Sequence, residues 1–101
     1  MTYRLIGPAK IEYRDSILYY LEEAGSQIAS DFDEAIEATL GLICEAPILA
    51  KQIVPDIRQR FVDGFPFSII YAVEDDEVVV LSVKHDSRAD EHWQARLQNP
   101  Q

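Results

Sequence analysis

The sequence predicts an α+β domain, with a helix hairpin packed on one face of a small antiparallel sheet in the order β-α-α-β-β-β-α. Three observations predict this class. Two long segments with apolar residues at helical spacing lie within residues 8–46 and are separated only at Gly25. Three apolar runs with the spacing of strands follow between residues 57 and 84, with turn sequences between them. A last helical pattern surrounds Trp93.

The N-terminal segment predicts a short strand and a long helix. Residues 2–6 have the pattern of a strand, and Gly7-Pro8 ends it, because proline suits the first turn of a helix. The first helix should span residues 8–24 and end at Gly25, a natural terminator. Its apolar face is predicted to consist of Tyr13, Ile17, Tyr20, Leu21 and Ala24.

The second helix should span residues 26–46, where Pro47 ends the helical pattern. The joint at Gly25-Ser26 is so short that the two helices should run antiparallel, as a hairpin. The acidic side chains of this segment lie away from a nearly complete apolar stripe. That stripe consists of Ile28, Phe32, Ala35, Ile36, Thr39, Leu40 and Ile43.

The C-terminal half predicts a loop, a three-stranded meander and a short helix. Residues 47–56 are interpreted as the loop, and the strands should span residues 57–63, 67–74 and 77–84. Asp63-Gly64 and Asp75-Asp76 have the chemistry of tight turns between antiparallel strands. The segment Ser87-Arg88-Ala89-Asp90 has the form of a capping box. The helix after it should place Ala89, Trp93 and Leu97 on one face, with Trp93 as a core anchor.

Composition and charge restrict the function. The chain has 101 residues, 48% hydrophobic and 27% charged, which is typical of one globular domain over residues 1–101. Its net charge is −9, the reverse of a general nucleic-acid binder, so the isolated chain is not expected to bind DNA or RNA directly.

The single cysteine, Cys44, excludes an internal disulfide and is predicted to be an inert, buried thiol. With no signal peptide or membrane-spanning run, we expect a cytoplasmic protein without a membrane partner.

The few cations gather near the predicted sheet, since six of the nine lie between Lys51 and Arg96. Alternation along the strands predicts that Ile57, Phe61, Phe67, Ile69, Tyr71, Val73, Val79, Leu81 and Val83 face the helices. The opposite face would then carry Arg58, Arg60 and Lys84 among hydroxyl and small side chains, as in a shallow site for phosphate or carboxylate. An alternative is that these cations only pair with the abundant acids of the chain.

His85 at the end of the last strand could serve as a general acid or base near neutral pH, although its spacing alone favours a structural bond to Asp86 or to the backbone. His92 is predicted to lie on the surface, and Glu12 and Glu22 do not make a convincing catalytic pair. The chain lacks phosphate-binding glycine motifs and a zinc-ligand pattern, so we expect no cofactor and no metal.

Several short motifs, taken in order, resemble those of one superfamily. The hairpin ends in a proline, an arginine lies on the next strand, an aromatic-Pro-aromatic entry precedes a tyrosine, and an apolar strand closes in His-x-x-Arg before a Trp-x-x-Arg tail. In this sequence the motifs are Glu45-Ala46-Pro47, Arg60, Phe65-Pro66-Phe67 with Tyr71, His85 with Arg88, and Trp93 with Arg96. Over nearly its whole length the chain thus resembles the RelE/ParE superfamily, the toxins of type II toxin–antitoxin (plasmid stabilisation) modules.

The resemblance implies two different activities. ParE-like members inhibit DNA gyrase, whereas RelE-like members cleave mRNA on the ribosome, which requires a base, an acid and cations for the phosphate. The residues that match the nuclease role by position are Arg60, Lys84 and His85, with Arg88 in support. Two departures favour the ParE-like activity: Ser68 stands where RelE-like nucleases often carry arginine, and a charge of −9 disfavours approach to ribosomal RNA.

Three hypotheses follow. The first is a ParE-like toxin that acts on gyrase or another topoisomerase, and the second is a ribosome-dependent endoribonuclease. The third is a non-toxic relative that only binds a partner peptide. All three imply a cognate antitoxin, whose extended segment would lie on the helix hairpin and sheet. Because the chain is acidic, this segment is expected to carry cations.

Overall fold

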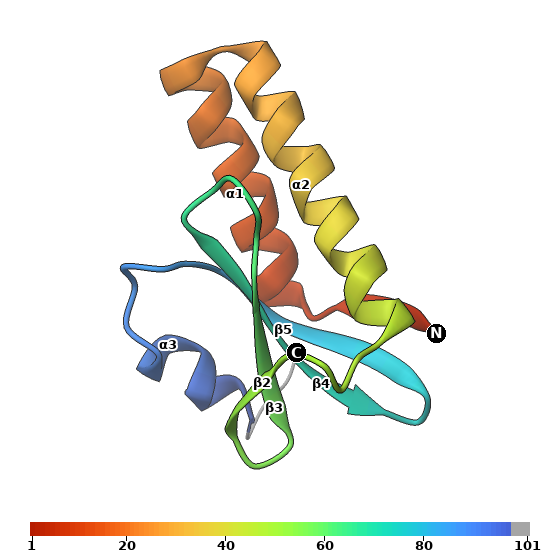
Figure 1. Cartoon of the computed structure of the whole chain (residues 1–101). Helices are drawn as coiled ribbons and strands as arrows, with labels where there is room; N and C mark the ends of the chain where they lie inside the picture. The colour runs from red at the N-terminus through yellow and green to blue at the C-terminus, as the bar shows by residue number, and fades with distance from the viewer. Residues whose placement is uncertain (98–101) are drawn as a thin grey trace.

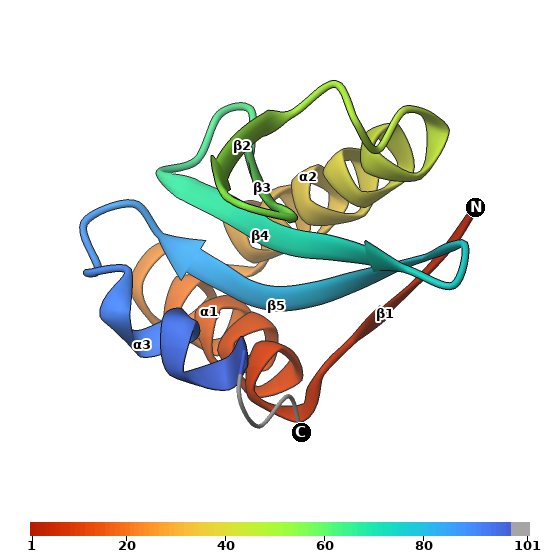
Figure 2. The same cartoon turned by 90° about the horizontal axis from the view of Figure 1, so that it is seen from below.

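The computed structural model describes residues 1–97 and has the predicted α+β architecture (Figures 1 and 2). The helix hairpin covers one face of a five-stranded sheet, and a short C-terminal helix lies against the other face. The elements are β1 (Thr2–Leu5), α1 (Gly7–Ala24), α2 (Ser26–Glu45), β2 (Lys51–Val54), β3 (Ile57–Phe61), β4 (Phe67–Glu74), β5 (Glu77–His85) and α3 (Glu91–Gln94), followed by a 3₁₀ turn at Ala95–Leu97.

The strands lie in the order β1-β5-β4-β3-β2. β1 pairs with β5 in parallel, and all the other pairs are antiparallel, so the predicted meander is confirmed. The predicted loop over residues 47–56 is wrong in one part, because β2 forms there as an edge strand. β2 has no clear apolar alternation, and its pairing with β3 is irregular between Gln52 and Val54. Its strand conformation therefore depends on the neighbouring strand and not on a local pattern.

Most of the buried side chains of the helix hairpin belong to α2. The side chains of Phe32, Ile36, Leu40 and Ile43 are fully buried, as predicted. The ring of Phe32 lies at the centre of an aromatic cluster that joins both helices to β4. Its centroid is 5.0 Å from that of Tyr20, 5.3 Å from Phe65 and 4.9 Å from Phe67. α1 is less deeply buried, and Leu21, predicted to face inward, is exposed.

A bulge in β5 changes which side chains face the hairpin. Ile70 lies opposite Ser82, but the next residue, Tyr71, lies opposite Val80, so Leu81 is an extra residue. Val83 shares the hairpin face with Ile69, as predicted. The placement of Val79 on that face is wrong, because the bulge reverses the alternation on its N-terminal side and Val79 pairs with Ala72 on the other face.

The predicted orientation of β3 is also wrong. Arg60 lies opposite Ile69 and Arg58 opposite Tyr71, so both arginines share the hairpin face. Phe61 lies opposite Ser68 on the other face and is 64% exposed. The apolar pattern of the sequence could not predict the orientation of β3, because the neighbouring strand β4 is buried on both of its faces. Arg58 has a structural partner on the hairpin side: its Nη1 donates to the Ala50 carbonyl, 2.8 Å away, in the loop after α2.

The C-terminal helix starts later than the capping pattern suggests. It begins at Glu91, and Asp90 at its N-cap makes no side-chain capping bond. The Asp90 carboxylate instead accepts from the indole Nε1 of Trp93 at 3.1 Å. Trp93 is fully buried, which confirms its role as a core anchor, whereas Leu97 is exposed.

Among residues 1–97, no helix has both the length and the apolar character that crossing a bilayer requires.

Tyr13 links the two helices through the acids of α2. Its hydroxyl donates to the Asp33 carboxylate and lies 3.0 Å from Glu37 Oε2, and burial together with these acceptors raises the pKa of Tyr13. Tyr13→Phe should therefore lower the free energy of unfolding by about 1–2 kcal/mol at pH 7. Because the folded-state pKa is raised, this contribution is complete below about pH 10 and declines at higher pH.

Urea unfolding at pH 7 and above pH 10 measures both effects, with Tyr19→Phe as the control, since Tyr19 is exposed. Equal stability of the Tyr13 and Tyr19 variants at pH 7 would contradict the assignment.

Candidate functional site at the end of strand β5

The predicted cationic face does not assemble. Arg60 lies opposite Ile69 on the hairpin side of the sheet, whereas Lys84 lies opposite Ser68 on the other side. The expectation that Arg60 and Lys84 share a face is therefore wrong. The Lys84 side chain is only 6% exposed, and its Nζ lies 3.5 Å from the Asp90 carboxylate. Lys84 thus pairs with a half-exposed acid of the same chain instead of facing an open surface.

His85 and Arg88 do come together, at a cavity of about 450 Å³ between α1 and the C-terminal half of β5. The cavity is open to solvent on one side and combines aromatic and charged side chains. Its lining consists of Glu12, Asp15, Ser16, Tyr19, Tyr20, Phe67, Val83, His85 and Arg88.

The His85 ring is held in one orientation. Its Nδ1 lies 3.1 Å from the backbone N–H of Ser87 and 2.8 Å from the Ser87 hydroxyl, and its ring packs edge-to-face on Phe67 at 5.1 Å. A backbone N–H can only donate, so Nδ1 is the acceptor and a neutral ring carries its proton on Nε2. Of the two structural partners expected for His85, the backbone bond forms, from the Ser87 N–H, whereas Asp86 accepts from Ser68 at 2.6 Å.

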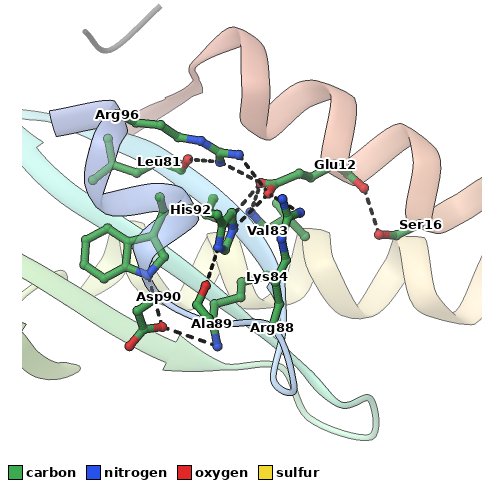
Figure 3. Close-up of polar contacts among 12 residues, drawn as sticks. Glu12, Ser16, Leu81, Val83, Lys84, Arg88, Ala89, Asp90, His92 and Arg96 are labelled. Atoms are coloured by element: carbon green, nitrogen blue, oxygen red, sulfur yellow. Dashed lines mark hydrogen bonds and ion pairs between the residues drawn. The ribbon is translucent and has the colours of Figure 1, made fainter. Parts of the chain in front are cut away.

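Glu12 of α1 is the hub of the polar contacts beside this cavity (Figure 3). Its side chain is 10% exposed and pairs with three side chains of the C-terminal segment. Arg96 approaches both carboxylate oxygens, at 3.0 and 3.1 Å, while Arg88 and His92 lie 3.3 and 3.1 Å from Oε2. Two guanidinium groups and one imidazole therefore converge on a single carboxylate.

The Glu12 carboxylate also forms a hydrogen bond with the backbone at the free edge of β5. β1 accompanies β5 only as far as Ile6, whose N–H donates to the Val80 carbonyl at 3.1 Å. Beyond that point Glu12 Oε1 accepts from the Val83 N–H at 3.1 Å, and Arg96 donates to the Leu81 carbonyl at 2.8 Å. Side chains from α1 and the 3₁₀ turn thus replace a strand where the edge would be unpaired.

The sequence reasoning missed Glu12 and His92 as functional candidates. His92 is not a surface residue: its Nε2 lies 3.1 Å from Glu12 and its Nδ1 lies 2.6 Å from the Ala89 carbonyl. One signal for Glu12 was visible in the sequence. Glu12 lies three residues after Ala9 and four residues before Ser16, so the three side chains share the inward side of α1. A carboxylate at such a position requires buried donors.

The arrangement favours structural pairing over phosphate chemistry. Arg88 pairs with Glu12 and Lys84 with Asp90, and Arg60 on β3 is separated from His85 on β5 by the intervening strand β4. Within residues 1–97 no group of His, Cys, Asp and Glu could hold a metal ion. Cys44 is partly buried, and burial raises the pKa of its thiol, so little of the reactive thiolate forms at neutral pH.

Comparisons with known proteins give concordant results. The family model described as "ParE toxin of type II toxin-antitoxin system, parDE" matches residues 4–90. A solved chain from the chromosomal ParDE toxin–antitoxin system of P. aeruginosa has a TM-score of 0.74 and 17% identity, over 84% of this chain and 95% of that one. The isolated RelE toxin of E. coli has a TM-score of 0.60 and 20% identity, over 96% of each chain. No curated protein sequence matches.

Proposed function

The chain belongs to the ParE toxin family of type II toxin–antitoxin systems, and from this membership we propose that it inhibits DNA gyrase or a related topoisomerase and is neutralised by a cognate antitoxin. It is the toxin half of such a module. Cleavage of mRNA is the alternative within the wider superfamily.

The dispersal of the cations is the observation that supports gyrase inhibition over cleavage. A ribonuclease would need Arg60, Lys84 and His85 around one phosphate, with donors placed where charge develops. Here Arg60 and Lys84 lie on opposite faces of the sheet, and Lys84 is buried against Asp90. His85 is the one member of this set that lines the cavity, together with Arg88.

The hairpin offers a surface suited to the antitoxin. Exposed apolar side chains lie along α1, among them Ile11 and Leu18. A second cavity of about 430 Å³ adjoins them and is lined by residues of β1, α1 and α2, with the acids Asp33 and Glu37 and the cations Lys10 and Arg14 among them. We expect an extended antitoxin segment with apolar anchors and cations to bind there, because the field of this chain is negative.

Induced expression in a bacterium, combined with a supercoiling assay on the purified chain, tests this function. We expect growth arrest with DNA-damage signalling, loss of gyrase supercoiling, and intact mRNA by RNA sequencing. His85→Ala and Arg60→Ala should retain gyrase inhibition within about threefold, because the proposal gives them no catalytic role.

Two outcomes would overturn the proposal. Codon-positioned mRNA cuts that disappear in His85→Ala would show a RelE-like nuclease. Normal growth together with undisturbed supercoiling would show a binding protein without toxicity.

A further inference from the structure

The C-terminal segment, residues 86–97, is held to the rest of the chain by few groups. Its helical part consists of the four residues of α3 and one 3₁₀ turn, too short to be stable without tertiary contacts. Within residues 86–97, Trp93 alone is fully buried, and His92 and Arg96 alone are partly buried. The buried part of the attachment therefore consists of one apolar anchor and two polar side chains, while Asp86, Arg88 and Asp90 add exposed polar contacts.

Both of these polar side chains bind the same acceptor. His92 and Arg96 approach the Glu12 carboxylate at 3.0–3.1 Å, and Arg88 adds a third, more exposed contact at 3.3 Å. A second attachment is made by Asp90, which pairs with Lys84 of β5. Asp90 is half exposed, so this pair is more open to solvent than the one between Glu12 and Arg96.

The hairpin and the remainder of the sheet have a separate source of stability. The aromatic cluster around Phe32 joins α1, α2 and β4 without any residue of the C-terminal segment. Regions held by few buried groups can open at a lower free energy than the core to which they attach.

We propose that residues 86–97 form a latch that opens as a unit while the hairpin and sheet stay folded, and that Glu12 holds this latch closed. In the closed form, Glu12 neutralises Arg88 and Arg96 and closes the free edge of β5. Opening exposes Trp93, the sheet surface beneath it and the Arg96 guanidinium group, and it releases the half-exposed Arg88 from Glu12. The latch thus controls whether an otherwise acidic chain presents Arg96 to solvent and leaves Arg88 unpaired from Glu12.

Glu12→Gln tests the latch on the full chain, with Trp93, the single tryptophan, as the probe. The variant keeps an acceptor for Val83 but leaves the guanidinium groups of Arg88 and Arg96 without this counter-charge, so the equilibrium constant for opening should rise about a hundredfold or more. We expect solvent-exposed Trp93 emission, stronger acrylamide quenching and trypsin cleavage after Arg88, with the far-UV circular dichroism of the hairpin and a cooperative thermal transition retained. Asp15→Asn is the matched control, because it removes the same charge from an exposed position of α1.

Urea titration of the unmodified chain provides a second arm that needs no variant. Trp93 fluorescence should change at a lower urea concentration than the circular dichroism of the helices. Coincident transitions would show that the segment leaves only when the whole domain unfolds, and would overturn the proposal. Trp93 that stays buried in a folded Glu12→Gln variant would also overturn it. If that variant does not fold, Arg96→Met should give the same local exposure of Trp93 in its place, and buried Trp93 there would overturn it equally.

Discussion

Phe32→Ala is expected to lower the free energy of unfolding by about 3–5 kcal/mol. Phe32 is fully buried, and three other rings lie within 5.3 Å of its centroid. Those rings come from α1, from the β3–β4 turn and from β4. They cannot collapse into the vacated volume without moving both helices relative to the sheet, so most of the cavity should remain. A domain of this size has a total stability of about 5–15 kcal/mol, so a substantial part of it would be lost.

Chemical denaturation followed by circular dichroism measures this change. Leu42→Ala in the same helix is the control, since Leu42 is 48% exposed and its truncation should cost less than about 1 kcal/mol. Similar losses in the two variants would show that the aromatic cluster is not the centre of the core.

A double-mutant cycle between Glu12 and Arg96 is expected to give the second large effect. Both side chains are nearly buried, at 10% and 14% exposure, and they pair through both carboxylate oxygens. Glu12→Gln and Arg96→Met should each lower the free energy of opening by about 3–5 kcal/mol. Glu12→Gln leaves Arg96 without its counter-charge, and Arg96→Met removes the nearly buried guanidinium that contacts both oxygens of Glu12. The double variant should lose clearly less free energy than the two single variants added together. The difference is the coupling energy between Glu12 and Arg96, which we expect to be about 2 kcal/mol or more.

The exposed pair of Arg14 and Asp15 supplies the comparison, at 67% and 60% exposure. Its coupling energy should be below about 1 kcal/mol and should fall further in high salt. All variants can be followed in urea by Trp93 fluorescence, which reports the segment that carries Arg96. If the free-energy losses of the Glu12 and Arg96 variants simply add in the double variant, Glu12 does not hold this segment through Arg96.

Local patterns predicted the framework of the fold because they depend on neighbours a few residues apart. The apolar stripe of α2 and the Gly25 joint required a helix hairpin, and the structure has it at the expected residues. The turns at Asp63-Gly64 and Asp75-Asp76 likewise required a meander, and positive φ angles occur at Gly64, Asp75 and Asp76.

The faces of the strands could not be predicted in the same way. Both faces of β4 are buried, one under the hairpin and one under the C-terminal segment, so apolar character does not distinguish them. One extra residue, Leu81, also reverses the alternation within β5. The first fact separated Arg60 from Lys84, because the orientation of β3 places Arg60 opposite Ile69 while Lys84 lies opposite Ser68, and the predicted cationic face is absent. The bulge moved only residues on its N-terminal side, such as Val79.

By itself the sequence determined the fold class, the hairpin, the antiparallel meander, the anchor at Trp93 and the family, since each depends on patterns short enough to be visible along the chain. Only the tertiary structure decided which cations remain available to a partner. That outcome depends on Glu12, which meets Arg88, His92 and Arg96 across some eighty residues of sequence. The side chains meet there because β1 stops short of the end of β5, leaving backbone groups at a sheet edge that only distant polar side chains can satisfy.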